Sequence, residues 1–304
     1  MASARPPATL GPYLEAVARA VPAGEALARD PVRFPRRYRD PRDVEAAALL
    51  AAQLAYGRVD LFGPVIARVL ALADARGGPG NFCATFGERD AASLAGVVYR
   101  WNRGEDFALL FRTLRTAWER HGSLGALFAP GPAKESLAGA IEALKACAPD
   151  ETTRGFRTWL ASPADGSACK RWLMLMRWMV RRDDVDLGLW AHLSPRDLVI
   201  PLDTHVMRLS RFCGLTARND AGWRTAEEVT AALRALDPGD PVRFDFALAH
   251  LGISGACRGF RDPEVCPACP LEAVCVATPR AAPATRAGDA RRRPASRTGP
   301  RGRA

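Results

Sequence analysis

The sequence predicts an all-α protein whose helical body is followed by a cysteine-rich loop. Apolar residues recur at helical spacing through most of the body, with short polar breaks between the runs. No stretch alternates apolar and polar residues as a hairpin strand would. Four of the eight cysteines fall within one short segment near the end of the chain. We therefore expect a helical body over residues 8–256, a cysteine loop over 257–277 and a disordered basic tail over 278–304.

Length and composition allow a substantial core. The chain has 304 residues, 48% of them hydrophobic, and no apolar run reaches the length of a membrane span. Residues 1–12 contain no apolar segment of the kind that a secretion signal carries. A secreted disulfide protein would combine such a signal with cysteines spread as a framework. We therefore expect a cytoplasmic monomer with no membrane partner.

Three helices are predicted in the first half of the body. The segment 43–57 is apolar and begins at Asp43, a residue type that favours helix starts. The segment 64–78 has a proline in its first turn and glycines at its end, the expected asymmetry of a helix. The segment 105–122 has apolar residues at helical spacing and ends at Gly122.

Three more helices are predicted farther along the chain. The segment 134–147 is one, and 225–236 opens with Thr225 and Glu228, which match a capping box. The segment 170–180 (KRWLMLMRWMV) is apolar on nearly every side, so we expect it to be buried in the middle of the protein. Its methionines are interpreted as core packing rather than as a ligand-binding stripe.

The clustered cysteines indicate a metal site. They are Cys257, Cys266, Cys269 and Cys275, separated by eight, two and five residues. Four thiolates in a short segment can close on one soft metal centre. Zinc usually sits on two Cys-x-x-Cys pairs or on mixed Cys and His ligands, whereas four-iron clusters tolerate this uneven spacing. The spacing favours a [4Fe-4S] cluster, with zinc or no metal as alternatives. The other cysteines are expected to be small buried hydrophobes: Cys83, Cys147, Cys169 and Cys213.

Two segments flanking the buried helix carry polar side chains suited to chemistry. Upstream, the turn SPADGSACKRW contains Gly166 and places Lys170 at the helix start. A lysine there opposes the helix dipole, and together with free backbone amides it suits an anion. Downstream, Asp203 precedes a helix that carries His205 and Arg208. Asp203 is explained either as an N-cap or as a functional carboxylate.

Aromatic residues are a further source of candidates. Tyr56 and Arg58 lie in a polar break after an apolar helix, and they are explained either as a helix terminus or as a contact to a separated strand or flipped base. Four tryptophans have side chains that can stack on a base. Buried packing is the favoured interpretation for each of them: Trp101, Trp172, Trp178 and Trp190.

Several of these segments resemble the helix-hairpin-helix DNA glycosylase superfamily, which includes endonuclease III and the adenine glycosylases. PLDTHVMRL resembles the segment that bears the catalytic aspartate, and FALAHLGISGACRGFRDPEVCPACPLEAVC resembles the iron–sulfur segment. The order of hairpin, aspartate helix and cysteine loop also matches. Segments such as DPVRFPRRY, AAQLAYGRVDLFGPV and IPLDTHVMRLSRFCGL, over roughly residues 30–255, resemble an uncharacterised bacterial family within this superfamily.

The resemblance implies a helix-hairpin-helix glycosylase-like fold and a DNA-repair glycosylase, with or without AP-lyase activity. The substrate would be a damaged or mispaired base flipped out of double-stranded DNA. Asp203 would stabilise a cation-like sugar or deprotonate the attacking water or amine, and Lys170 would attack the sugar carbon to form a Schiff base. A [4Fe-4S] cluster and association with the nucleoid are implied as well. The expected DNA contacts are Gly166, His205, Arg208, Tyr56 and Arg58.

The chain departs from the superfamily pattern at three points. The turn DGSAC lacks the second glycine of the usual Leu-Pro-Gly-x-Gly hairpin. The segment between Lys170 and Asp203 is longer than in endonuclease III. Two more residues than is typical separate Cys257 from Cys266. Two alternatives therefore stay open, namely a non-catalytic nucleic-acid-binding protein on the same scaffold and a zinc-stabilised interaction module.

The positive charge is concentrated in the tail. From Thr278 to Ala304 there are eight arginines against one aspartate, so the tail carries +7 of the formal net charge of +10. Few large apolar residues occur there, which predicts disorder. Such a tail would add non-specific, salt-sensitive attraction to phosphates. A solvated tail with no specific partner is the alternative.

Overall fold

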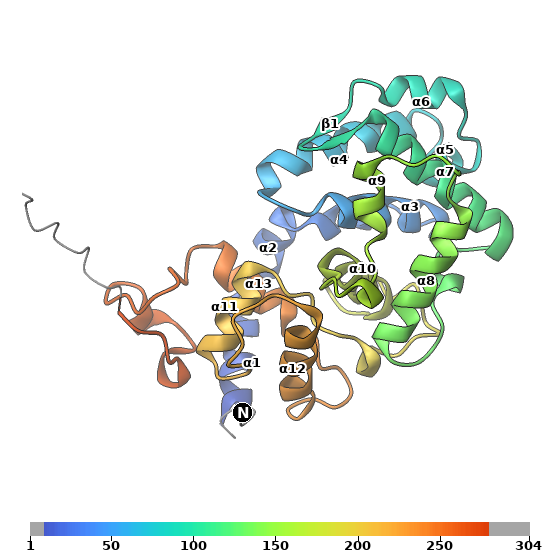
Figure 1. The fold of residues 1–304 in the computed structure, drawn as a ribbon. Helices are drawn as coiled ribbons and strands as arrows, with labels where there is room; N and C mark the ends of the chain where they lie inside the picture. Colours follow the sequence, from blue (N-terminus) through green and yellow to red (C-terminus); the bar gives the residue numbers. More distant parts are fainter. Residues whose placement is uncertain (1–8, 280–304) are drawn as a thin grey trace, which may run out of the picture.

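The computed structural model describes residues 9–279, and this part of the chain is mostly helical, as the sequence predicts. Figure 1 shows two helical lobes, with α10 (Lys170–Val180) near the junction between them. The basic tail lies almost entirely outside the described residues. The upper lobe contains helices from the middle of the chain: α3 (Pro41–Leu54), α4 (Val59–Asp74), α5 (Pro79–Ala84), α6 (Glu88–Leu94), α7 (Gly104–His121), α8 (Ala133–Cys147) and α9 (Arg154–Arg157).

The lower lobe joins the first helix to the last ones. Helix α13 packs against both α1 and α11, so segments from the two ends of the chain lie side by side. The chain leaves this lobe after α2 (Ala23–Arg29) and returns after α10. The helices of the lower lobe are α1 (Leu10–Ala20), α11 (Thr204–Phe212), α12 (Trp223–Arg234) and α13 (Asp245–Ile253).

Short 3₁₀ turns connect these helices. Two lie between α2 and α3, four between α7 and α11, and two in the cysteine loop. Their bounds are η1 (Pro31–Arg33), η2 (Pro35–Arg37), η3 (Gly125–Leu127), η4 (Thr158–Leu160), η5 (Pro163–Asp165), η6 (Pro195–Asp197), η7 (Cys266–Ala268) and η8 (Glu272–Val274).

Helix α3 is the buried axis of the upper lobe. Every residue from Val44 to Leu54 is buried, and the helix packs on α5 and α10. It begins two residues earlier than predicted, because Asp40 caps it and Pro41 occupies its first position, where no backbone N–H is needed. Asp43 lies in the first turn and accepts a hydrogen bond from Gly80 N–H instead (2.7 Å).

Helix α10 confirms the prediction of a buried central helix. All residues from Trp172 to Val180 are buried, including the methionines that were interpreted as core packing. The Trp172 indole N–H donates to the Trp159 carbonyl at 2.8 Å. Arg177 is the one charged residue in this buried stretch, and its guanidinium lies among carboxylates.

Two other predicted helix starts are also wrong. Helix α4 begins at Val59 rather than at Pro64, which lies inside the helix. Helix α12 begins at Trp223 with Gly222 as its N-cap. Thr225 is therefore not an N-cap, and its hydroxyl donates to Asp220 (2.9 Å).

A small hairpin in the upper lobe was not predicted. Strands β1 (Val98–Tyr99) and β2 (Asn102–Arg103) pair in antiparallel fashion around a turn formed by Arg100 and Trp101. Two residues per strand are too few to show an alternating pattern. Trp101 is 53% exposed, so the packing interpretation is wrong for this tryptophan, whereas the other three are buried as expected.

The scattered cysteines are buried, as predicted. Burial raises the pKa of the Cys213 thiol to about 12 and that of Cys169 to about 11, so both remain protonated and unreactive at neutral pH. No helix among residues 9–279 is long and apolar enough to cross a membrane. The four buried cysteines are Cys83, Cys147, Cys169 and Cys213.

Candidate functional site

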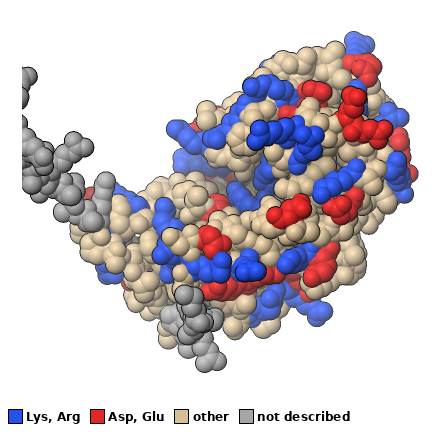
Figure 2. All heavy atoms as spheres, in the orientation of Figure 1, with Lys and Arg blue, Asp and Glu red and all other residues tan. Residues whose placement is uncertain are grey.

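A cleft of about 1160 Å³ lies between the two lobes. It brings Lys170 and Asp203 into one cavity. Figure 2 shows lysine and arginine side chains on both sides of the hollow between the lobes. The segments that contribute to its walls are residues 29–31, 55–62, 158–177, 201–206 and 245–253, together with Ala221.

Asp203 is both the N-cap of α11 and a residue of the cleft wall. Its Oδ1 accepts hydrogen bonds from the backbone N–H groups of His205 (2.8 Å) and Val206 (2.7 Å). Its Oδ2 makes no hydrogen bond to the described residues. The two explanations of Asp203 are therefore compatible, because one oxygen caps the helix and the other is left for the cavity.

Lys170 is the first residue of α10 and is half-buried in the same cleft. Its Nζ lies 3.3 Å from the carbonyl oxygen of Ala55, at the end of α3. Cys169, just before it, adopts a left-handed conformation with φ of 49°, which turns the chain sharply into the helix. The chain has three lysines, and the other two, Lys134 and Lys145, lie on α8.

An aromatic pair joins the cleft to the small hairpin: Tyr56 lines the cleft, and Trp101 of the hairpin packs on it outside the cleft lining. The rings of Tyr56 and Trp101 are stacked, with centroids 5.0 Å apart and planes 19° apart. The Tyr56 hydroxyl donates to Asn102 Oδ1 (2.6 Å), and the Asn102 amide is held by the buried Asp106 (3.1 Å). The pair is thus fixed from behind, while Trp101 keeps an exposed face. Burial raises the pKa of Tyr56 to about 12, so its hydroxyl stays neutral.

The other predicted DNA contacts divide between the cleft and its surroundings. His205 and the exposed Arg58 line the cleft, and Arg58 pairs with Asp60 at 2.9 Å. Gly166 does not line the cleft; it is exposed, with a left-handed φ of 78° at the turn before α10. Arg208 does not line it either, since its Nη2 contacts the Cys257 carbonyl (3.3 Å) and ties α11 to the cysteine loop.

Sequence reasoning missed Arg171, which lines the cleft next to Lys170. Its guanidinium donates to the carbonyls of Gln53 (3.0 Å) and Thr158 (2.6 Å) and lies 5.5 Å from the centroid of the Tyr56 ring. Burial lowers the pKa of this arginine. The one feature of the sequence that could have identified it as a cleft residue is its position directly after Lys170.

A buried ion network forms the floor of the cleft and was also missed. Arg177 Nη1 bonds Asp245, and its Nη2 lies 3.3 Å from Asp186. Asp30 accepts from His250 (3.1 Å). Burial alone would raise the pKa of Asp30, but the His250 hydrogen bond and the Arg177 charge outweigh it and lower that pKa. These residues are far apart in sequence, so their pairing is visible only in the fold.

The four clustered cysteines lie in the loop that follows α13, and all are partly buried. Burial raises the pKa of Cys269, and the nearby Cys257, Cys275 and Cys266 raise it further. The Leu271 N–H donates to the Cys269 sulfur, which suits a thiolate that is a metal ligand. Four thiol donors within one loop are the donor chemistry that a soft metal centre takes. No group of three or more Cys, His, Asp or Glu side chains within residues 9–279 is arranged so that it could already hold an ion.

The loop is fastened to the lower lobe at its end. The Val276 N–H donates to the Phe212 carbonyl at the end of α11 (2.9 Å), and Arg261 N–H donates to the Thr278 carbonyl (2.8 Å). Arg258 pairs with both Asp262 (2.8 Å) and Glu264 (3.2 Å), although it is exposed. The cysteine loop is thus joined to the helix that Asp203 caps.

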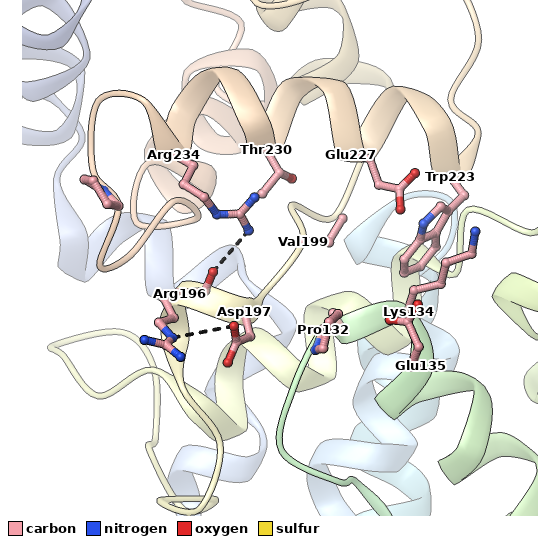
Figure 3. A pocket seen from close by; sticks show the side chains of 12 residues that line it. Pro132, Lys134, Glu135, Arg196, Asp197, Val199, Trp223, Glu227, Thr230 and Arg234 are labelled. Atoms are coloured by element: carbon pink, nitrogen blue, oxygen red, sulfur yellow. Dashed lines mark hydrogen bonds and ion pairs between the residues drawn. The ribbon is translucent and has the colours of Figure 1, made fainter.

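A separate pocket of about 500 Å³ lies between α12 and the start of α8, away from these residues (Figure 3). Arg234 donates to the Arg196 carbonyl at 3.1 Å across its opening, and Arg196 lies 3.7 Å from Asp197. Its three basic and three acidic side chains balance, and none of the predicted site residues lines it. The pocket offers no net charge to a nucleic acid.

Sequence comparison gives one family. Residues 30–254, well over half of the chain, match the family described as "Protein of unknown function (DUF2400)". No curated protein and no solved structure matches the chain.

Proposed function

The chain belongs to the DUF2400 family of proteins of unknown function, and we propose that it is a DNA-repair glycosylase-like protein that acts on a flipped base. The observation that carries this proposal is the meeting of Asp203 and Lys170 in one interlobe cleft. Segments on either side of the buried α10 supply a carboxylate and an amine to the same cavity. Those are the two groups that base excision through an amine requires.

The lysine is a specific choice in this chain. Arginine supplies nearly all of the positive charge, and the three lysines are Lys134, Lys145 and Lys170. Arginine holds its proton too tightly to act as a nucleophile, whereas lysine can lose it. A lysine in the cleft therefore supports chemistry rather than simple attraction to phosphate.

In the proposed reaction, Asp203 Oδ2 faces the sugar as the bond to the base breaks. The negative charge stabilises the cation-like sugar in a cavity partly shielded from water. The neutral form of the Lys170 amine attacks the sugar carbon, and the bond to the base breaks with its electron pair leaving on the base. The proton that the attacking nitrogen then loses passes through solvent to the departing base. The resulting amine adduct can then open to a Schiff base.

The aromatic pair supports a nucleic-acid partner. Trp101 presents an exposed ring stacked on Tyr56, which lines the cleft, and Arg100 lies 5.7 Å from the Tyr56 centroid. Base–aromatic stacking tolerates any base, because every base has a π face. A flipped base, or the gap that it leaves, would find a flat partner here.

We further propose that Cys257, Cys266, Cys269 and Cys275 hold a [4Fe-4S] cluster, with zinc as the alternative. Such a group would cross-link the loop and supply no step of the reaction. The loop would then be held rigid. Through the hydrogen bond from the Val276 N–H to the Phe212 carbonyl, a rigid loop would also restrain α11, the helix that Asp203 caps. A protein that is nucleoid-associated rather than membrane-bound follows from the proposed substrate.

A second candidate function is a non-catalytic nucleic-acid-binding protein. The observation that favours it is the contact of Lys170 Nζ with the Ala55 carbonyl, which holds the amine at the cleft wall. The turn DGSAC before α10 has one glycine where the glycosylase hairpin has two, which also favours a protein without catalysis.

Borohydride trapping on duplexes carrying a panel of damaged and mispaired bases separates the two. We expect a covalent protein–DNA adduct with wild type, no adduct with Lys170→Gln, and a wild-type level with Lys134→Gln, an exposed lysine of α8. Binding without base release across the whole panel would favour the non-catalytic function. No binding would exclude both.

A further inference from the structure

Asp245, on the cleft floor, has no part in the reaction proposed above. It is the first residue of α13, is 3% exposed, and lines the same cleft as Asp203 and Arg177. Its Oδ2 accepts a hydrogen bond from Arg177. Its Oδ1 is buried and has no hydrogen-bond partner in the described part of the chain. A bare, buried carboxylate oxygen is costly unless it carries a proton.

The surrounding charges leave Asp245 poorly compensated. Arg177 is shared with two other carboxylates, Asp186 and Asp30. On the α11 side lie Asp203, which raises the pKa of Asp245, and His205, which lines the same cleft. On the α1 side, Glu15 is already paired with Arg243. One guanidinium therefore faces three acids, and a second, Arg181, is engaged with Asp183, Asp186 and Asp240.

Asp245 is consequently poised to bind a proton. Burial raises its pKa to about 6, since Arg177 offsets only part of the penalty and Asp203 adds to it. A nucleic acid over the cleft would exclude water and bring phosphates close, and both effects raise a carboxyl pKa. A moderate further rise in the pKa of Asp245 would bring it above neutral pH, so that the carboxyl group becomes protonated.

We propose that Asp245 takes up a proton on its Oδ1 when a nucleic acid covers the cleft, so that the complex contains one neutral and one ionised carboxyl, Asp245 and Asp203. The proton comes from solvent, and no bond between heavy atoms changes. Asp245 is thus a positioning residue, because losing its charge removes a repulsion against the neighbouring Asp203. The inference rests on the proposed nucleic-acid partner.

Calorimetric titration in buffers of different ionisation enthalpy measures the proton directly. The full-length protein is titrated with a short duplex that contains a tetrahydrofuran abasic-site analogue. At neutral pH we expect wild type to take up about one proton per complex, and we expect Asp245→Asn to take up none. Asp60→Asn removes an exposed carboxyl from the rim of the same cleft and should behave as wild type.

The outcomes separate this inference from the proposed function. Equal proton uptake by wild type and Asp245→Asn overturns the inference while leaving DNA binding intact. If Asp245→Asn does not fold, the wild-type profile decides, because uptake must fade below about pH 6, where Asp245 is already protonated. Uptake that persists there overturns the inference. Absence of binding by wild type overturns the proposed function, and the inference with it.

Discussion

At the scale of single residues, the capping role of Asp203 allows its chemical role to be tested in a folded protein. Asn caps helices about as well as Asp, so Asp203→Asn should keep the two backbone bonds that start α11. It removes the negative charge from the cleft. We expect unchanged thermal unfolding and DNA binding, with base release slower by about 100- to 1000-fold. Asp60→Asn is the matched control. Equal excision by the parent and Asp203→Asn would remove the carboxylate from the mechanism.

A second residue-scale prediction concerns stability and pH. The folded-state pKa of Asp245 is raised from 3.8 to about 6, so between these values the folded protein binds more protons than the unfolded chain. The free energy of unfolding should therefore fall as the pH rises through this window. Relative to Asp245→Asn, wild type should lose about 2 kcal/mol between about pH 4 and pH 7. Chemical unfolding of both proteins across this range measures it, and parallel curves would contradict it.

At the scale of elements, the cysteine loop and the scattered cysteines should behave differently. Cys266→Ala or Cys269→Ala should lose the metal and lower the yield of folded protein, because metal binding is coupled to folding. Cys83→Ala and Cys147→Ala, in buried helical positions, should keep the parent metal content. Elemental analysis after anaerobic purification distinguishes iron from zinc. Equal metal content in all four variants would show that the cysteine loop is not a metal site.

The hairpin of β1 and β2 is the other element with a testable role. Trp101→Ala removes an exposed ring, so we expect normal folding but a loss of about 1–3 kcal/mol in binding single-stranded or abasic DNA. Val98→Ala changes an exposed apolar residue of the same hairpin and should bind as the parent does. Fluorescence anisotropy with a labelled strand measures both. Equal affinities would show that Trp101 does not stack on a base.

At the scale of the whole molecule, the sequence predicted those features that depend on interactions between residues close together in the chain. The apolar faces of α3, α7, α8 and α10, the cap at Asp203 and the stop at Gly122 depend on residues within a few positions of one another. The hairpin escaped prediction because strands of two residues are too short to show an alternating pattern. The cleft floor escaped because Arg177, Asp186 and Asp245 meet only after the chain has returned to the lower lobe. In the same way, Asp203 and Lys170 were identified as candidates separately, but their common cavity is a property of the fold.

The distribution of charge over the whole chain leads to a final prediction. Residues 280–304, outside the described part of the chain, hold eight arginines and one aspartate. A chain ending at Pro279 would keep the bridge between Arg261 and Pro279 that closes the cysteine loop. Each phosphate neutralised contributes about 0.9 to the slope of log affinity against log salt. The shortened chain should therefore bind DNA more weakly at low salt and with a shallower slope, yet rank damaged bases in the same order, since the cleft is unchanged. Binding isotherms at several salt concentrations measure both properties. An unchanged slope would show that the tail does not touch DNA, and an altered ranking would show that it takes part in selecting the base.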